Sequence, residues 1–371
     1  MTDVGDESFA VSRGRHLTTS LVHHARPLWR GLGKLESSML RSRIEQTAIE
    51  KPIYISGLAR SGTSVLIEIV ASHPDVATHQ YRDFPFLFTP YWWRQALDRG
   101  AMPAEQARER AHGDRLMVTS QSPEAMEEVL WMAYFRDLHD ARRCHALDAT
   151  TSNPAFERFY RDHIRKLLLI AGRTRYATKG NYNLTRMAYL QQLFPDARFV
   201  LPVRRPREHI ASLMKQHQIF TAAAKRHPRS VAHLDRVGHF EFGAHRHCIN
   251  PDGRAEIVES IEDLWRSGHD VRGWARYWAN LYRWVNALLE SNQALRRATL
   301  IVRYEDLCDH SERTLQRLLQ HCCLPDPSDE LPKRWALTLR RPTYYQPEFS
   351  HAEESAIAKE TDGVAAALGY T

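Results

Sequence analysis

The sequence predicts an α/β fold in which a central parallel sheet is flanked by helices. Three observations favour this class. Short apolar runs with β-branched residues recur along the chain, segments of helical periodicity separate them, and the first run leads through a glycine-rich turn directly into a helix. Strands that alternate with helices of this length are typical of βαβ units and parallel sheets.

The first strand is expected at residues 52–57, which spell Pro-Ile-Tyr-Ile-Ser-Gly. Apolar residues then fall at helical spacing at Val65, Leu66, Ile69 and Val70. The unit is therefore predicted to be a strand, a tight turn and a helix.

The rest of the domain repeats this alternation. Further elements are expected, in chain order, as a helix over residues 156–168, a strand at 176–178, a helix over 184–194, a strand at 198–201 and a last strand at 299–303. Pro202 is expected to end or shift the strand at 198–201, because proline has no backbone N–H to donate to a neighbouring strand. The aromatic residues from Trp274 to Tyr282 have helical spacing and are expected to form the buried face of a helix instead of a surface that stacks on a cofactor.

The chain divides into a basic helical extension at residues 1–50 and a main domain at residues 51–371. Residues 217–270 are rich in histidine and charge without a clear period, and are expected to form an insertion over the carboxyl edge of the sheet. Residues 13–43 hold seven basic residues and one acid, Glu36, interleaved with leucines. We favour a pair of solvated helices packed on the main domain, because Pro27 and the glycines after it interrupt the apolar face. The alternative is a surface that contacts an anionic membrane or a partner subunit.

Composition narrows the class of protein. The 371 residues are 43% hydrophobic and 26% charged, which is typical of globular proteins. The net charge of +7 suggests anionic small-molecule partners, without the charge density of a nucleic-acid-binding tail. No apolar run is long enough to cross a bilayer, acids stand where a signal peptide carries bases, and the five cysteines do not suit a disulfide framework. We expect a cytoplasmic protein, with peripheral membrane contact through residues 13–43 as the open alternative.

The chemistry is expected at residues 57–64, which spell Gly57-Leu-Ala-Arg60-Ser61-Gly62-Thr63-Ser64. Two glycines five residues apart, between a strand and a helix, have the spacing of a phosphate-binding loop. A nucleoside triphosphatase needs a lysine after the second glycine, where this chain has Thr63. The loop still offers backbone N–H groups and a helix N-terminus to an anion, with Arg60 as its cation. The pattern therefore indicates an anionic ligand other than ATP.

A second anion site is expected after the strand at 198–201. Arg204 follows this strand, and Ser212 lies about two turns into the next helix, so a guanidinium and a hydroxyl can converge on one phosphate. Two such sites at neighbouring strand ends suit a nucleotide with phosphates on two separate oxygens.

At these residues the chain resembles the sulfotransferase superfamily, which transfers sulfuryl groups from 3'-phosphoadenosine 5'-phosphosulfate. The 57–64 loop is similar to the family's 5'-phosphosulfate loop, and Arg204 with Ser212 to its 3'-phosphate site. Residues 194–199 and 302–307 resemble further family segments. The resemblance implies a P-loop NTPase-like sulfotransferase fold and 3'-phosphoadenosine 5'-phosphosulfate as co-substrate, with no metal. It implies donor contacts from Arg60, Ser61, Gly62, Thr63, Ser64, Arg204 and Ser212.

The same resemblance implies catalytic residues. Lys179 is similar to a lysine that many members place near the transferred group. Members related to protein-tyrosine and bacterial glycolipid enzymes carry a carboxylate base near residue 83, so Asp83 is the first candidate for the base and His79 the second. Each has a structural alternative: Asp83 in an ion pair with Arg82 or Arg94, and His79 as a buried or surface imidazole.

Three glutamates offer a further possibility for the base or the acceptor site. Glu124, Glu127 and Glu128 could line that site, although acids at a helix start also stabilise the helix. The pair His245 and His247 lacks the spacing of a closed zinc site, so no metal is expected there.

The predicted reaction is in-line transfer of a sulfuryl group to an acceptor hydroxyl of a glycan, lipid or phenol. Arg60, Lys179 and the N–H groups of residues 61–64 would stabilise the developing charge. The alternatives are a P-loop kinase or hydrolase, for which the lysine and a magnesium-binding aspartate are missing, and a non-catalytic nucleotide- or membrane-binding protein.

Overall fold

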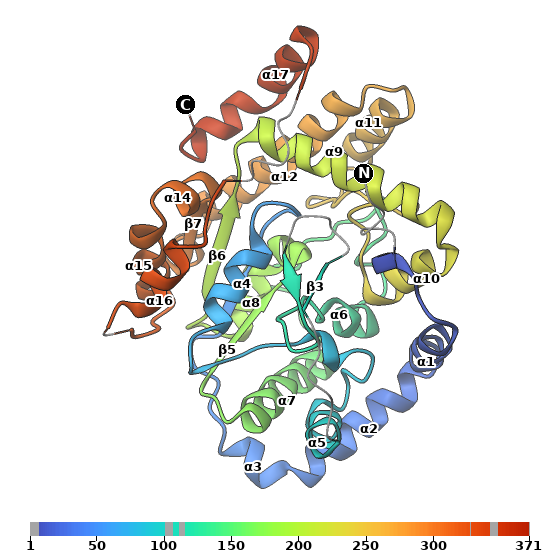
Figure 1. Ribbon diagram of the computed structural model, residues 1–371, viewed down its shortest axis with the longest axis vertical. Helices are drawn as coiled ribbons and strands as arrows, with labels where there is room; N and C mark the ends of the chain where they lie inside the picture. Colours follow the sequence, from blue (N-terminus) through green and yellow to red (C-terminus); the bar gives the residue numbers. More distant parts are fainter. Residues whose placement is uncertain (1–6, 101–106, 111–115, 327, 342–347, 371) are drawn as a thin grey trace.

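The protein was analysed as a computed structural model that describes residues 7–100, 107–110, 116–326, 328–341 and 348–370. Its centre is a five-stranded sheet in the order β2-β5-β1-β6-β7, in which every neighbouring pair is parallel. The strands are β1 (Ile53–Ile55), β2 (Val76–Ala77), β5 (Arg175–Lys179), β6 (Arg198–Val203) and β7 (Thr299–Arg303). The predicted fold class, a parallel sheet flanked by helices, is confirmed (Figure 1).

Helices cover both faces of the sheet because its strands are buried on both sides. Ile53 and Ile55 point into a core with α4 (Thr63–Ala71) and α15 (Ser311–His321). Tyr54, between them, points into the opposite core with α7 (Pro154–Ala171), α8 (Met187–Leu193) and α12 (Asp270–Ser291). This alternation is the two-residue period of an extended strand. It explains why β1 is apolar at successive positions.

The aromatic stripe of α12 belongs to the second core. Trp274, Trp278 and Tyr282 are fully buried there, as expected from their spacing. The remaining helices and short helical turns surround the sheet and its two cores. They are η2 (Tyr81–Asp83), α5 (Pro90–Arg99), α6 (Glu128–Tyr134), η3 (Asn181–Arg186), α13 (Gln293–Ala298), α14 (Tyr304–Asp309), α16 (Glu330–Ala336) and α17 (His351–Ala367).

β6 runs two residues further than expected, through Pro202 to Val203. Its Val200 carbonyl accepts a hydrogen bond from the Ser56 N–H at 2.9 Å, so Val200 faces β1. Pro202, two residues on, faces the same side, where β1 has already ended at Ile55. The backbone N–H that Pro202 lacks would therefore point to a place where β1 offers no acceptor. β6 continues past this point because it still pairs with β7.

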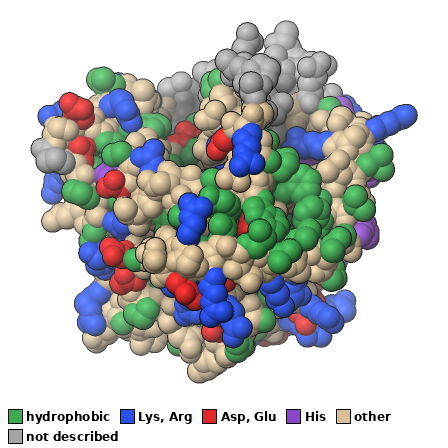
Figure 2. Space-filling view, turned by 90° about the horizontal axis from the view of Figure 1, so that it is seen from below, with side chains coloured by type: hydrophobic (Ala, Val, Ile, Leu, Met, Phe, Trp, Pro, Cys, Tyr) green, Lys and Arg blue, Asp and Glu red, His purple; other side chains and the backbone are tan. Residues whose placement is uncertain are grey.

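The basic N-terminal segment is helical and packs on the main domain. It forms η1 (Glu7–Phe9), α1 (Arg13–His24), α2 (Arg26–Met39) and α3 (Arg41–Glu45). Helices α1, α2 and α3 follow the right-hand and lower edges of Figure 1, and this lower end of the molecule faces the viewer in Figure 2. Glu36 of α2 is fully buried, and its carboxylate lies 2.8 Å from Lys166 Nζ of α7. A buried ion pair thus fastens α2 to the core.

The segment at residues 217–270 is largely helical. It comprises the end of α9 (Pro206–Arg226), then α10 (Pro228–Val237), an irregular stretch and α11 (Ala255–Arg266). The sequence pattern does not predict the short antiparallel hairpin of β3 (Arg108–Glu109) and β4 (Met117–Val118). Among the described residues, no helix combines the length and apolar character needed to span a bilayer.

Candidate active site

The 57–64 loop links β1 to α4 and depends on a glycine at its end. Gly62 has φ +107°, in the left-handed region, and a Cβ there would lie 2.8 Å from Cδ2 of Tyr304. Glycine alone satisfies both constraints. Arg60 also has a positive φ, of 72°, which costs a residue with a Cβ about 1–2 kcal/mol. The surrounding fold therefore holds the Arg60 backbone in a strained conformation.

The structure brings the two predicted anion elements together. Arg60 Nε, in the loop before α4, donates to Ser212 Oγ of α9 at 3.2 Å. Arg204 Nη1 lies 3.5 Å from the Arg60 carbonyl oxygen, and its guanidinium carbon is 5.1 Å from the centroid of the Tyr304 ring. Two guanidinium groups thus converge beside the N-terminus of α4.

Lys179 ends β5 and joins this group from the other side. Its Nζ donates to Ser64 Oγ at 2.8 Å, and the Arg110 Nη1 donates to the same oxygen at 2.8 Å. The first-turn N–H groups of α4 add their partial positive charge at this point. Arg110 was not foreseen, because it lies in the short hairpin that carries no periodic signal in the sequence.

These residues lie on one wall of a cleft of about 960 Å³. The charged and polar lining residues include Arg60, Thr63, Ser64, Arg110, Glu124, Lys179 and Arg204. Apolar and aromatic residues line another part of it, namely Phe9, Phe84, Met126, Phe220, Leu234, Val237 and Phe242. One cleft therefore brings basic, acidic and apolar side chains together, and α9 and α10 supply several of the apolar ones.

Two of the expected donor contacts do not reach the cleft. Ser61 is fully buried, and its N–H donates to the Leu58 carbonyl at 3.1 Å, so this N–H is used within the loop. Ser212 is not part of the cleft lining and touches Arg60 instead. Gly62, Thr63 and Ser64 line the cleft.

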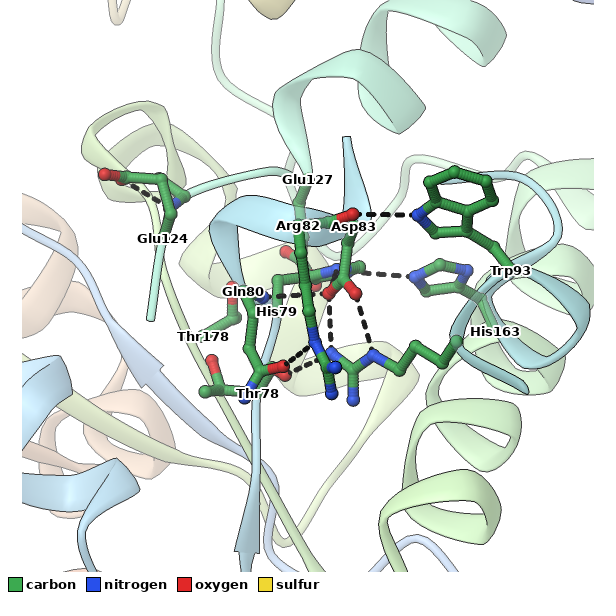
Figure 3. A network of polar contacts seen from close by, with 12 residues as sticks. Thr78, His79, Gln80, Arg82, Asp83, Trp93, Glu124, Glu127, His163 and Thr178 are labelled. Atoms are coloured by element: carbon green, nitrogen blue, oxygen red, sulfur yellow. Dashed lines mark hydrogen bonds and ion pairs between the residues drawn. The ribbon is translucent and has the colours of Figure 1, made fainter. Parts of the chain in front are cut away.

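Asp83 and His79 are not at the cleft, contrary to expectation. Asp83 is buried, and it accepts hydrogen bonds from Arg94 Nε at 2.8 Å and Arg94 Nη2 at 2.5 Å. Its Oδ2 also accepts from the Gln80 N–H at 2.8 Å (Figure 3). Burial by itself would raise the pKa of Asp83, but hydrogen bonds from Arg94 and His79 hold that pKa well below its usual range. The ion pair with Arg94 is one of the structural alternatives raised above.

His79 belongs to the same buried network. It has no exposed surface, its Nδ1 lies 3.3 Å from Asp83 Oδ2, and its Nε2 lies 3.0 Å from His163 Nε2. Burial lowers the pKa of His163 well below its usual value. This network ties the segment after β2 to α5 and α7, away from the cleft wall.

Glu124 is the carboxylate that meets the cations. Its Oε1 lies 2.8 Å from Lys179 Nζ, its side chain is 18% exposed, and it lines the cleft. Burial would raise the pKa of Glu124, but the charge of Lys179 and its hydrogen bond outweigh burial and lower this pKa to about 2. Figure 3 shows Glu124 set apart from the Asp83 network.

The neighbouring glutamates have other partners. Glu127 accepts hydrogen bonds from the hydroxyls of Tyr160 at 2.7 Å and Tyr176 at 2.5 Å, and burial raises its pKa. Glu128 lies 2.8 Å from Arg186 Nη1 and 2.7 Å from a ring nitrogen of His139. Of the three, Glu124 alone pairs with a cation of the loop region in the described structure.

The described part of the chain contains no group of three or more His, Cys, Asp or Glu residues placed to hold a metal ion. His245 is paired instead with Asp235, its Nδ1 2.9 Å from Oδ1.

A family model described as the sulfotransferase family matches residues 52–257, which is 206 of the 371 residues. The chain belongs to the sulfotransferase family. The matched region of this sulfotransferase contains the 57–64 loop, Glu124, Lys179, Arg204 and Ser212. No curated protein matches the sequence significantly.

Solved sulfotransferase structures resemble this sulfotransferase over most of its length. STF1 of Mycobacterium tuberculosis is 16% identical with a TM-score of 0.46, over 90% of this chain and 81% of the other. STF9 of Mycobacterium avium is 12% identical with a TM-score of 0.48, over 91% and 82%. The sulfotransferase domain of the curacin biosynthetic pathway is 16% identical with a TM-score of 0.38, over 88% and 99%. The family assignment rests on the family model.

Proposed function

We propose that this sulfotransferase uses 3'-phosphoadenosine 5'-phosphosulfate as donor and transfers its sulfuryl group to the hydroxyl of an acceptor with an apolar portion. The observation that carries the proposal is the arrangement at the ends of β1, β5 and β6. There Arg60, Arg204 and Lys179 converge on the N-terminus of α4, and Glu124 pairs with Lys179 at 2.8 Å.

The cations suit a donor with two separate anionic groups. The 57–64 loop and Lys179 would hold the 5'-phosphosulfate, through the N–H groups of the first turn of α4 and the charged side chains. Arg204 would hold the 3'-phosphate, to which a guanidinium can donate two parallel hydrogen bonds. The strained Arg60 backbone keeps a guanidinium between the two positions, so its charge is in place before the donor arrives.

Glu124 is the proposed general base. Its carboxylate would take the proton of the acceptor hydroxyl while the oxygen attacks sulfur, and the bond between sulfur and the bridging oxygen would break. The bridging oxygen would leave with the electron pair as part of adenosine 3',5'-bisphosphate. Lys179 stands 2.8 Å from Ser64 Oγ and 2.8 Å from Glu124, so it can turn from the carboxylate to the leaving oxygen.

Donor binding would also strengthen this base. Against the effect of burial, the charge and hydrogen bond of Lys179 lower the pKa of Glu124 to about 2. An anionic donor competes for Lys179, and burial, which raises the pKa, then acts on Glu124 with less opposition. The carboxylate becomes more basic when the sulfuryl group is present.

The acceptor is expected to be partly apolar because the cleft wall is. Phe84, Phe220 and Phe242 face the same cleft as the cations, with Leu234 and Val237 of α10 beside them. A lipid, a glycolipid or a phenol has both a hydroxyl and an apolar body suited to this lining.

Two measurements test the proposal. Calorimetry should show binding of adenosine 3',5'-bisphosphate without Mg²⁺, and labelled donor should transfer its sulfate to a hydroxyl in a panel of phenols, sterols and glycolipids. Arg297, an exposed arginine of α13, offers a control, since Arg297→Ala should leave donor binding unchanged. Mg²⁺-dependent binding of ATP with no binding of the bisphosphate would refute the proposed donor and favour a kinase.

A further inference from the structure

Hydrophobic side chains gather on the outer face of the N-terminal helices. In the described chain, five of the seven large hydrophobic residues with exposed side chains belong to α1 and α2. They are Leu17 and Leu21 of α1 and Leu28, Leu35 and Met39 of α2, which we name the leucine stripe, and they are between 51% and 69% exposed. Figure 2 shows hydrophobic side chains gathered on this side of the molecule, with Lys and Arg side chains around them.

The stripe follows the helical repeat. Leu17 and Leu21 are four residues apart, and Leu28, Leu35 and Met39 are spaced by seven and four, so each set lies on one side of its helix. The opposite sides are packed: Val22 is buried in α1, and Gly33 and Glu36 are buried in α2.

The residues expected to interrupt an apolar face do not do so. Pro27 lies in the first turn of α2, where proline is compatible with a helix, and α2 continues through Gly31 and Gly33 to Met39. A Cβ on Gly33 would lie 2.6 Å from the Phe88 carbonyl oxygen. This glycine therefore lets α2 approach the core closely and leaves the outer side of the helix intact.

The exposed charged side chains of α1 and α2 themselves are all basic. Arg13, Lys34 and Arg41 are exposed, and residues 13–44 contain a single acid, Glu36. Glu36 is fully buried against Lys166, so it does not offset these cations at the surface. The first exposed acid that follows is Glu45, which pairs with Arg41 at 2.9 Å.

We propose that α1 and α2 dock on the surface of a bilayer that contains anionic lipids. The leucine stripe would enter the boundary between headgroups and acyl chains, while Arg13 and Lys34 would contact lipid phosphates and carboxylates. An anionic bilayer fits both the cations and the apolar side chains of this face. Nucleic acid would leave the leucine stripe without a partner, and the cations would repel the same face of a second copy of the chain.

Docking in this way places the cleft next to the bilayer. Phe9 and Val11, just before α1, and Arg15 of α1 line the cleft whose chemistry is described above. The membrane contact itself needs neither donor nor acceptor, so it can be tested apart from the proposed reaction.

The test is co-sedimentation of the full chain with vesicles of phosphatidylcholine, with and without phosphatidylglycerol. Binding is expected to the anionic vesicles, with much less to the neutral ones, and added salt should weaken it. The triple variant Leu17→Gln, Leu21→Gln, Leu28→Gln should lower the partition coefficient on the order of a hundredfold, since each leucine contributes about fivefold when half of its surface leaves water.

Charge and control variants sharpen the test. Arg13→Gln and Lys34→Gln should each lower binding to anionic vesicles about fivefold and leave binding to neutral vesicles unchanged. Leu337→Gln is the matched control, because Leu337 is 76% exposed but lies beyond α16 at the other end of the sequence. Circular dichroism and thermal unfolding confirm that each variant is folded.

Three outcomes would overturn the proposal. One is no binding to anionic vesicles by a folded protein, and another is binding that the triple variant does not weaken beyond the Leu337→Gln control. The third is a dimer in sedimentation velocity that the triple variant dissociates, without vesicle binding, which would assign the face to a second copy of the chain.

Discussion

Replacement of Glu124 by glutamine separates the proposed general base from the carboxylate that the sequence favoured. The amide keeps the shape of the side chain and an oxygen that can accept from Lys179, but it cannot take a proton. We expect turnover at saturating donor to fall by about 10² to 10⁴. The pKa of Glu124, lowered from 4.5 to about 2, implies that loss of its charge also costs about 3 kcal/mol of unfolding free energy at neutral pH, so turnover is compared for the folded protein.

Asp83→Asn should lower stability but leave turnover almost unchanged. Both partners of the ion pair between Asp83 and Arg94 are buried, so the variant leaves a guanidinium without its counter-charge. Removal of one partner of such a pair costs about 3–5 kcal/mol of unfolding free energy. The specific activity of the folded fraction should stay near that of the wild type.

The assay is transfer of labelled sulfate under saturating donor, combined with urea unfolding of the same preparations. Glu290→Gln, at an exposed position of α12, controls for the loss of one negative charge. The pH profile gives a second readout: kcat/KM for the donor reports the free enzyme, in which the Glu124 pKa is about 2, so no acidic limb near pH 6.5 should appear.

The reasoning fails if the effects are exchanged. An Asp83→Asn variant of normal stability with turnover reduced a hundredfold, beside a Glu124→Gln variant of near-normal turnover, would return the base to the buried network. An acidic limb near 6.5 that disappears in His79→Ala would assign the proton transfer to the imidazole.

Three further predictions follow from the charges of the site and its surroundings. Arg60→Ala should lower turnover on the order of 10², because the loop loses a preorganised cation; near-normal turnover would exclude this role. Arg204→Ala should weaken adenosine 3',5'-bisphosphate by about 1.5–3 kcal/mol but adenosine 5'-phosphate little, and an unchanged ratio of the two affinities in calorimetry would contradict the 3'-phosphate assignment. Burial raises the pKa of Glu128, but the charge of Arg186 and the contact with His139 outweigh burial and lower this pKa from 4.5 to about 2. The ionised Glu128 therefore stabilises the fold fully above pH 4.5, and this stabilisation is lost as the pH falls toward 2. Glu128→Gln should therefore cost about 3 kcal/mol at neutral pH and flatten the fall in stability between pH 5 and 2, and an unfolding profile parallel to the wild type would argue against this contribution.

The sheet, the 57–64 loop and the place of Arg204 after β6 could be predicted from the sequence. These features depend on local patterns. Runs of β-branched residues mark the strands, a glycine that needs a positive φ marks the 57–64 loop, and a fixed spacing between strand and helix places the arginine after β6. The extent of β6 could not be predicted in this way, because the tolerance of Pro202 depends on where the neighbouring strand ends.

Whether Asp83 or Glu124 lines the cleft depends on contacts between distant segments of the folded chain. The segments that contain Asp83 and Glu124 lie antiparallel through a bridge between Gln80 and Pro123, and the Glu124 N–H donates to the His79 carbonyl at 3.0 Å. In this register Glu124 meets Lys179, while Asp83 turns back to the Gln80 N–H and to Arg94. Both acids follow similar polar stretches, so nothing local distinguishes them. The different places of Asp83 and Glu124 arise from contacts between segments about 40 residues apart in the sequence. A long-range contact also buries Glu36, the one acid of α1 and α2, against Lys166, and the outer face of these helices is left with exposed basic and apolar side chains.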